Sequence, residues 1–130
     1  MRKSVTLMLG AILVATVPAA AAEKLAPEAQ LARAVEGRVA GQAVDCINLR
    51  PSGSHQIVED SAIIYRTGST LYVNRPRSGA QSLNQMDALL TRTFSSQLCS
   101  GDVVEVVDPV SGTMRGLVFL GEFVPYKRVR

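Results

Sequence analysis

The spacing of hydrophobic and polar residues divides the chain into three parts. Residues 5–17 are almost continuously apolar. Residues 23–42 place apolar side chains every four positions, which is close to the period of an α-helix. From residue 43 onward, apolar and polar positions alternate with the period of a β-strand. The pattern therefore predicts an apolar N-terminal segment, one helix and a β-rich domain over residues 43–130.

The N-terminal segment has the order of features that is typical of a secretory signal peptide. Arg2 and Lys3 precede the apolar run, and a proline and four alanines follow it. The run is shorter than the roughly twenty residues of a membrane-spanning helix, and no cysteine follows it to carry a lipid anchor. We expect residues 1–22 to be a signal peptide cleaved between Ala22 and Glu23. The mature protein is then periplasmic or secreted and is not an integral membrane protein.

The helix is predicted over residues 23–42. Leu31, Val35 and Val39 repeat at helical spacing and form one apolar stripe, which predicts packing against a sheet. Gly41 is predicted to end the helix, because glycine favours the backbone conformation that follows a last helical turn.

The rest of the chain reads as a series of short strands. Gly68 and Ser69 separate two β-rich runs and have the composition of a two-residue hairpin turn. Residues 76–85 and 95–101 read as connections. Strands are predicted over residues 44–49, 55–58, 61–67, 70–75, 88–94, 103–107 and 114–121. We expect a mainly β fold, a small antiparallel barrel or sandwich of six to seven strands, with the N-terminal helix covering one face or one end.

Size and charge limit the functional classes. The chain has 130 residues, and removing the 22 of the signal leaves 108, which fits one domain. Of the 14 basic residues, two leave with the signal, so 12 remain against 11 acidic ones and the net charge is +1. A charge so close to zero gives no reason to expect nucleic acid as a partner.

The mature chain has two cysteines, Cys46 and Cys99. Two thiols in an oxidising compartment favour one disulfide bond, and we predict that bond here. Two separate buried thiols are the alternative. A redox-active pair is disfavoured, because the Cys-x-x-Cys spacing is absent.

The residues do not favour an enzyme. His55 is the only histidine, and it lies in a turn-like Ser-Gly-Ser-His segment. The sequence contains no His-x-x-x-His, no Gly-x-Ser-x-Gly and no phosphate-binding glycine-rich loop. We therefore predict no catalytic residue, no metal and no cofactor. A hydrolase or metal site centred on His55, with Asp45, Glu59 or Asp60, is the alternative.

Two basic clusters are candidate contact surfaces. Arg75 and Arg77 begin the 76–85 loop, and Tyr126, Lys127 and Arg128 lie near the C-terminus. Either cluster can make a weak contact with an anionic envelope surface, at about 1 kcal/mol for each basic residue. Solvated loops and a frayed tail are the commoner interpretation of such clusters.

An ordered set of short motifs resembles a family of small exported proteobacterial proteins of unknown function. The motifs are Asp45-Cys46-Ile47, Ile64-Tyr65, Tyr72-Val73-Asn74, Gln97-Leu98-Cys99-Ser100-Gly101-Asp102 and Leu120-Gly121-Glu122-Phe123. Members of that family often carry two further cysteines, which are both missing here. The joint absence of these two cysteines is consistent with the loss of one disulfide bond, and it supports a bond between the remaining Cys46 and Cys99. The resemblance implies export and a disulfide-bearing β domain, and it transfers no catalytic residue.

The sequence thus favours an exported, non-enzymatic β domain that binds an envelope protein or a small ligand. A purely structural envelope component is the other alternative.

Overall fold

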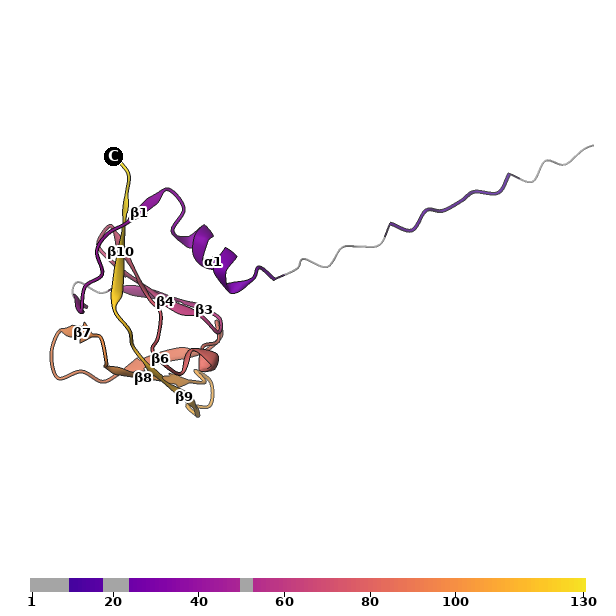
Figure 1. The fold of residues 1–130 in the computed structure, drawn as a ribbon. Helices are drawn as coiled ribbons and strands as arrows, with labels where there is room; N and C mark the ends of the chain where they lie inside the picture. Colours follow the sequence, from indigo (N-terminus) through magenta and orange to yellow (C-terminus); the bar gives the residue numbers. More distant parts are fainter. Residues whose placement is uncertain (1–9, 18–23, 50–52) are drawn as a thin grey trace, which may run out of the picture.

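The computed structural model describes residues 10–17, 24–49 and 53–130, and the expected cleavage position between Ala22 and Glu23 lies outside this part of the chain. Residues 10–17 form neither helix nor strand and extend away from a single β-rich domain (Figure 1). The domain has one α-helix, α1 (Pro27–Ala34), and one short 3-10 helix, η1 (Ala80–Ser82). The strands are β1 (Arg38–Ala40), β2 (Cys46–Asn48), β3 (Ser54–Val58), β4 (Ala62–Thr67), β5 (Thr70–Asn74), β6 (Ala88–Thr91), β7 (Gln97–Cys99), β8 (Val103–Val107), β9 (Met114–Phe119) and β10 (Phe123–Arg128).

These strands form three antiparallel sheets. The largest has the order β1-β10-β5-β4-β3, the second has the order β6-β8-β9, and β2 pairs with β7. The prediction of a mainly β, antiparallel fold with one helix is confirmed. The expected barrel is not formed, because the described strands do not close on themselves, and they number ten rather than six or seven.

The helix is shorter than the predicted 23–42. It ends at Ala34, and Gly37 follows with a positive φ of 74°, a conformation in which a side chain is strained. The chain then enters β1, where Arg38 pairs with Arg128 and Ala40 with Tyr126. Gly41 therefore does not end the helix. Val39 was assigned to the helical stripe, but its β-branched side chain belongs to a strand that exists only because β10 is present to pair with it.

Two further strands lie where connections or a tail were expected. β7 occupies part of the predicted 95–101 connection and pairs with β2. β10 includes Tyr126, Lys127 and Arg128, so the expected frayed tail is instead an interior strand between β1 and β5. Pro125 makes β10 hard to predict from sequence, because proline has no N–H to donate and therefore argues against an interior strand.

The five-stranded sheet separates two hydrophobic cores. On one face, Leu31 of α1 packs with side chains of β3, β4 and β5, which are Val58, Ala62, Ile64, Leu71 and Val73. On the other face, the sheet packs against the two smaller sheets around Phe123, Leu98, Val104, Val106 and Val118. The predicted packing of the helix against a sheet is thereby confirmed.

Candidate functional site

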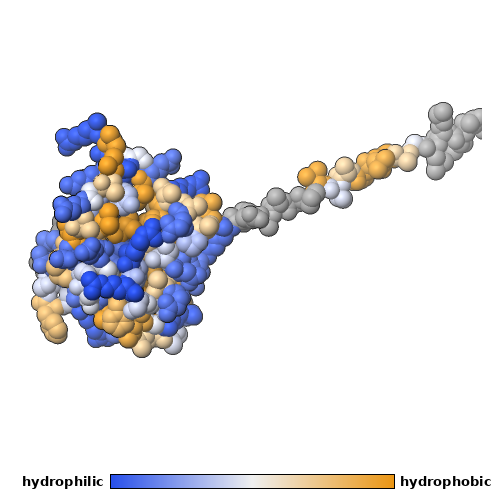
Figure 2. All heavy atoms as spheres, viewed as in Figure 1, coloured by the Kyte–Doolittle hydropathy of each residue, from blue (hydrophilic) through white to orange (hydrophobic). Residues whose placement is uncertain are grey.

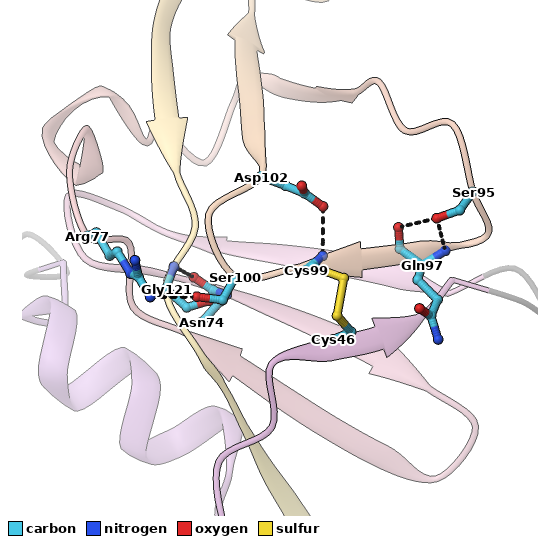
Figure 3. The surroundings of a disulfide bond; sticks show 9 residues. All are labelled: Cys46, Asn74, Arg77, Ser95, Gln97, Cys99, Ser100, Asp102 and Gly121. Atoms are coloured by element: carbon cyan, nitrogen blue, oxygen red, sulfur yellow. Dashed lines mark hydrogen bonds between the residues drawn. A yellow bond between two sulfur atoms is a disulfide. The ribbon is translucent and has the colours of Figure 1, made fainter.

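The disulfide joins the two strands of the smallest sheet. Cys46 of β2 and Cys99 of β7 are directly paired, with 4.0 Å between their Cα atoms (Figure 3). The Cys99 N–H also donates to Asp102 Oδ2 at 2.7 Å, which fixes the turn after β7. The predicted bond is confirmed, and both cysteines are structural.

The helix covers only part of the five-stranded sheet. Residues that pair across strands share a face, so Val124 and Tyr126 of β10 lie on the same face as Val73 and Leu71 of β5. That face carries α1, which packs over β3, β4 and β5. The part over β10 and β1 is only half-buried or exposed. Figure 2 shows hydrophobic atoms among hydrophilic ones on the side that carries the C-terminal strand.

A cleft of about 380 Å³ lies on this uncovered part and is called here the sheet cleft. Its lining comes from the end of β5 with the following loop and from the start of β10. The residues are Val73, Arg75, Arg77, Gly121, Glu122, Val124 and Tyr126. Three of the five predicted contact residues, Arg75, Arg77 and Tyr126, therefore line one cleft although two basic clusters were expected.

Asn74 holds the two sides of the sheet cleft together. Its Nδ2 donates to Gly121 O at 2.8 Å, and its Oδ1 accepts from Gly121 N at 3.0 Å (Figure 3). A Cβ at position 121 would lie 2.3 Å from Arg75 O, so glycine is required for this approach of the two backbones. The floor of the cleft is consequently fixed relative to Arg75 and Arg77.

The two arginines differ in how far their charges are compensated. Arg75 donates to both carboxylate oxygens of Glu28 on α1, at 2.8 and 3.0 Å. Hydrogen bonding to Arg75 lowers the pKa of Glu28, and the same bond raises the pKa of Arg75. Arg77 donates to the neutral Ser100 Oγ at 3.0 Å, and no ion pair joins it to any described residue. Its positive charge remains available to a ligand.

A second basic group lies further along the same face. Arg128 of β10 pairs with Arg38 of β1. Arg66 lies on β4, two strands away from β10, and it shares this face because it pairs with Leu71, which in turn pairs with Tyr126. Desolvation, and then the charges of Arg128 and Arg66, lower the pKa of Arg38. Lys127 alternates with Tyr126 and Arg128 and therefore points to the opposite face. The predicted residue Lys127 is thus separated from the others.

The carboxylates proposed as partners of His55 do not meet it. Glu59 is paired with Lys24, and Asp60 follows Glu59 in the turn after β3. The Asp45 backbone accepts a hydrogen bond from Ser100 N beside the disulfide. Over residues 24–49 and 53–130, no hydrogen bond joins His55 to a carboxylate, and the centroid of its ring lies 6.4 Å from that of Tyr65.

Across the described ranges there is no group of three His, Cys, Asp or Glu side chains that suits a metal ion. Within the same ranges, no helix has the length and hydrophobicity needed to cross a bilayer.

No family model, curated protein or solved structure matches the chain. The resemblance to small exported proteobacterial proteins accordingly remains a prediction from the residues quoted above.

Sequence reasoning missed part of the candidate site. Val124 was not assigned to any strand, and Arg38 and Arg66 were not recognised as neighbours of Arg128. Their proximity depends on the position of β10 between β1 and β5. The signal for a strand here is the run of β-favouring residues Phe123, Val124 and Tyr126.

Proposed function

We propose that the chain is an exported, non-enzymatic binding domain that recognises an anionic group of an envelope protein or a small ligand in the sheet cleft. One observation carries the proposal: the fold gathers an apolar floor and a cation that has no ion-pair partner among the described residues, from segments far apart in the sequence. Val73 and Val124 supply the floor, Tyr126 supplies an aromatic side, and Arg77 supplies the charge.

Electrostatics favour an anion with an apolar part. Arg77 can bind a carboxylate or phosphate through two parallel N–H donors, which is the geometry that guanidinium groups provide. Arg38, Arg66 and Arg128 add positive charge on the same face, which attracts anions at low salt. Glu122 lines the cleft and offsets part of this charge, so recognition requires the anion to reach Arg77.

Octyl phosphate tests the proposal, because it combines an anionic head with an apolar chain. Isothermal titration calorimetry should show binding that weakens with added salt. Arg77→Ala should weaken it about tenfold, because a charge-assisted hydrogen bond is lost. Arg92→Ala is the matched control, since Arg92 pairs with Glu105 on the other sheet and does not line the cleft. Equal loss in both variants, or no binding at all, contradicts the proposal.

A second experiment tests whether the natural ligand is an envelope protein. The oxidised protein, used as bait in an envelope extract, should retain a specific partner that Arg77→Ala loses and Arg92→Ala keeps. A Cys46→Ser, Cys99→Ser variant should also lose it if the scaffold depends on the bridge. Absence of any partner or ligand favours a purely structural role.

A further inference from the structure

A separate cleft lies beside β3, the strand at the far edge of the five-stranded sheet from β1. It has a volume of about 340 Å³ and is called here the His55 cleft. β3 forms one wall with His55, Gln56 and Ile57, and the segment after η1 forms the other with Gln85 and Asp87. It shares no lining residue with the sheet cleft.

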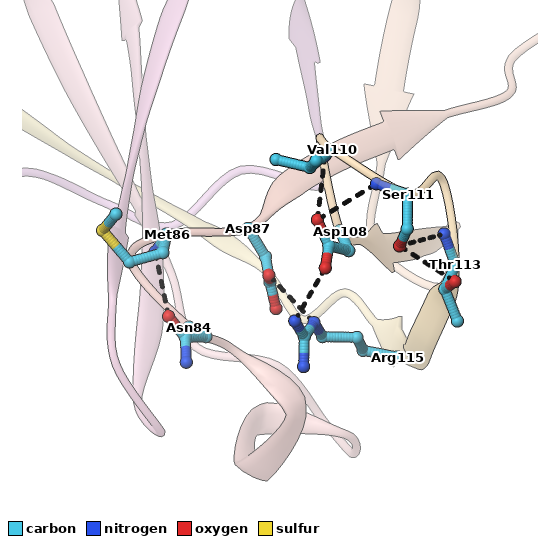
Figure 4. A network of polar contacts seen from close by, with 8 residues as sticks. All are labelled: Asn84, Met86, Asp87, Asp108, Val110, Ser111, Thr113 and Arg115. Carbon is cyan, nitrogen blue, oxygen red and sulfur yellow. Dashed lines mark hydrogen bonds and ion pairs between the residues drawn. The ribbon is translucent and has the colours of Figure 1, made fainter.

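Asp87 is the unusual residue of this cleft. Its side chain is only 4 % exposed, and one carboxylate oxygen, Oδ1, lies 3.1 Å from Arg115 Nε (Figure 4). The other oxygen, Oδ2, is buried and has no hydrogen-bond partner among the described residues. Leaving a buried charged acceptor without a donor costs more than leaving a neutral one, so Oδ2 needs a donor.

The surrounding charges specify which kind of donor fits. Arg115 is shared, because its Nη2 also pairs with Asp108 Oδ2 at 3.0 Å. Asp87, Arg115 and Asp108 together therefore carry one net negative charge. The cleft lining contains no lysine or arginine. Lys24 lies in a neighbouring hollow beside α1 and is paired with Glu59.

His55 does not supply the missing positive charge. Desolvation lowers the pKa of His55, so its ring is neutral at pH 7 and offers one acceptor nitrogen. The side-chain amides of Gln56 and Gln85 offer two further acceptors, and Ile57 offers an apolar contact. The cleft thus has several acceptors around one buried carboxylate.

We propose that the His55 cleft binds a small ligand through a primary ammonium group, which donates to Asp87 Oδ2. The ammonium compensates the net negative charge, and its other donors reach the neutral acceptors of the cleft wall. Asp87 lines the cleft while its Oδ2 is buried, so binding requires a local shift that exposes this oxygen. Gln85 and Met86 are exposed, so few apolar contacts hold the segment before Asp87, and its recognisable tie to α1 is the hydrogen bond from Gln85 Nε2 to Gln30 Oε1 at 2.6 Å.

Propylammonium chloride is the probe, and n-propanol is its neutral counterpart of similar size. In ¹⁵N-resolved NMR titrations of the oxidised protein, propylammonium should shift the amide signals of residues 55–57 and 85–87, and propanol should not. Asp87→Asn keeps the shape of the side chain and removes its charge, so affinity should fall about tenfold. Asp108→Asn is the matched control: it lowers the charge around Arg115 by the same amount but leaves the Asp87 carboxylate in place, so it should weaken binding less than Asp87→Asn.

A variant that gains affinity guards against loss of binding through misfolding. Gln85→Glu adds a second carboxylate to the cleft wall and should tighten propylammonium binding severalfold. Nα-acetyl-lysine amide and glucosamine then separate a lysine side chain from an amino sugar as the source of the ammonium, and failure of both counts against the proposal. Equal binding of propanol, equal loss in Asp87→Asn and Asp108→Asn, or no gain in Gln85→Glu would overturn it.

Discussion

Asn74 is a fully buried polar residue whose two hydrogen bonds both go to the backbone of Gly121. Replacing it with alanine leaves the N–H and the carbonyl of Gly121 without partners in a buried environment. Each orphaned group costs about 1–3 kcal/mol, so we expect Asn74→Ala to lower the free energy of unfolding by about 3 kcal/mol. Urea denaturation measures this loss.

Asn84→Ala is the control for this prediction. Asn84 is exposed and accepts one hydrogen bond, from Met86 N at 2.9 Å. Its replacement should change the free energy of unfolding by less than about 1 kcal/mol. Equal losses in the two variants would show that Asn74 does not carry the proposed role.

His55 gives a prediction for the pH dependence of stability. Desolvation lowers its pKa in the folded protein, so the unfolded chain takes up the proton at a higher pH than the folded one. Between the two pKa values the unfolded state binds more protons, and stability therefore falls as the pH drops below about 6.5. Urea denaturation over roughly pH 7.5 to 5.5, the range in which a histidine titrates, measures this effect. The free energy of unfolding should change less with pH in His55→Gln than in the unmodified protein. An unchanged pH dependence contradicts a lowered pKa of His55 in the folded protein.

Single residues were predictable where their chemistry is local. The disulfide followed from the count of two cysteines and the expected oxidising compartment. Asn74 and Asp87 gave no local signal, because an Asn after a strand or an Asp in a loop is ordinary until a distant segment packs against it.

At the scale of elements, Gly79 decides how closely β9 approaches the η1 segment. Gly79 has a φ of 85°, and a Cβ there would lie 2.1 Å from Leu117 O. Gly112 also has a positive φ, 74°, but no atom lies within 4 Å of its Cβ position. Gly112→Ala should cost about 1–2 kcal/mol through backbone strain alone. Gly79→Ala should cost clearly more in thermal denaturation, and equal costs would contradict this packing.

The disulfide gives a second prediction at this scale. It closes a loop with a sequence separation of 53 residues, for which chain entropy gives about 4 kcal/mol of stabilisation. Cys46→Ser with Cys99→Ser should therefore lower the urea midpoint strongly. Reduction of the unmodified protein should reproduce the loss and leave the double variant unchanged. Insensitivity of the protein to reductant would contradict a structural role.

The predictable elements were those with local pairing. The β4–β5 hairpin forms as expected, with Thr67 paired to Thr70 across Gly68 and Ser69. β8 also has its predicted bounds. β1, β7 and β10 are held by partners far away in the sequence, so no local pattern specified them. Pro125 and the four-residue spacing that ends at Val39 even favoured other assignments.

At the scale of the whole molecule, one experiment tests both the proposed export and the disulfide. Mass spectrometry of the protein recovered from the periplasm of a Gram-negative host should show a chain that begins at Glu23 and lacks two hydrogens relative to the reduced form. The result follows from signal cleavage and from oxidation of Cys46 and Cys99. A chain that retains residues 1–22 would contradict export through a cleaved signal.

The arrangement of the sheets explains why the sequence placed Arg75, Arg77 and Tyr126 in two clusters and not in one cleft. Arg75 and Arg77 lie about fifty residues from Tyr126 and Arg128, and only the insertion of β10 beside β5 brings them to one face. The helix packs mainly over β3, β4 and β5, and it leaves the same face half-buried over most of β10 and mostly exposed over β1.

The most direct test of the central claim is to map where octyl phosphate binds, by ¹⁵N-resolved NMR of the oxidised protein. We predict that shifts concentrate within residues 73–77 and 121–126, the two segments that contain the lining of the sheet cleft, and that Arg77→Ala makes them smaller at the same ligand concentration. Shifts that lie elsewhere, or that are equally large in Arg77→Ala at the same ligand concentration, would contradict the assignment of this cleft as the binding surface.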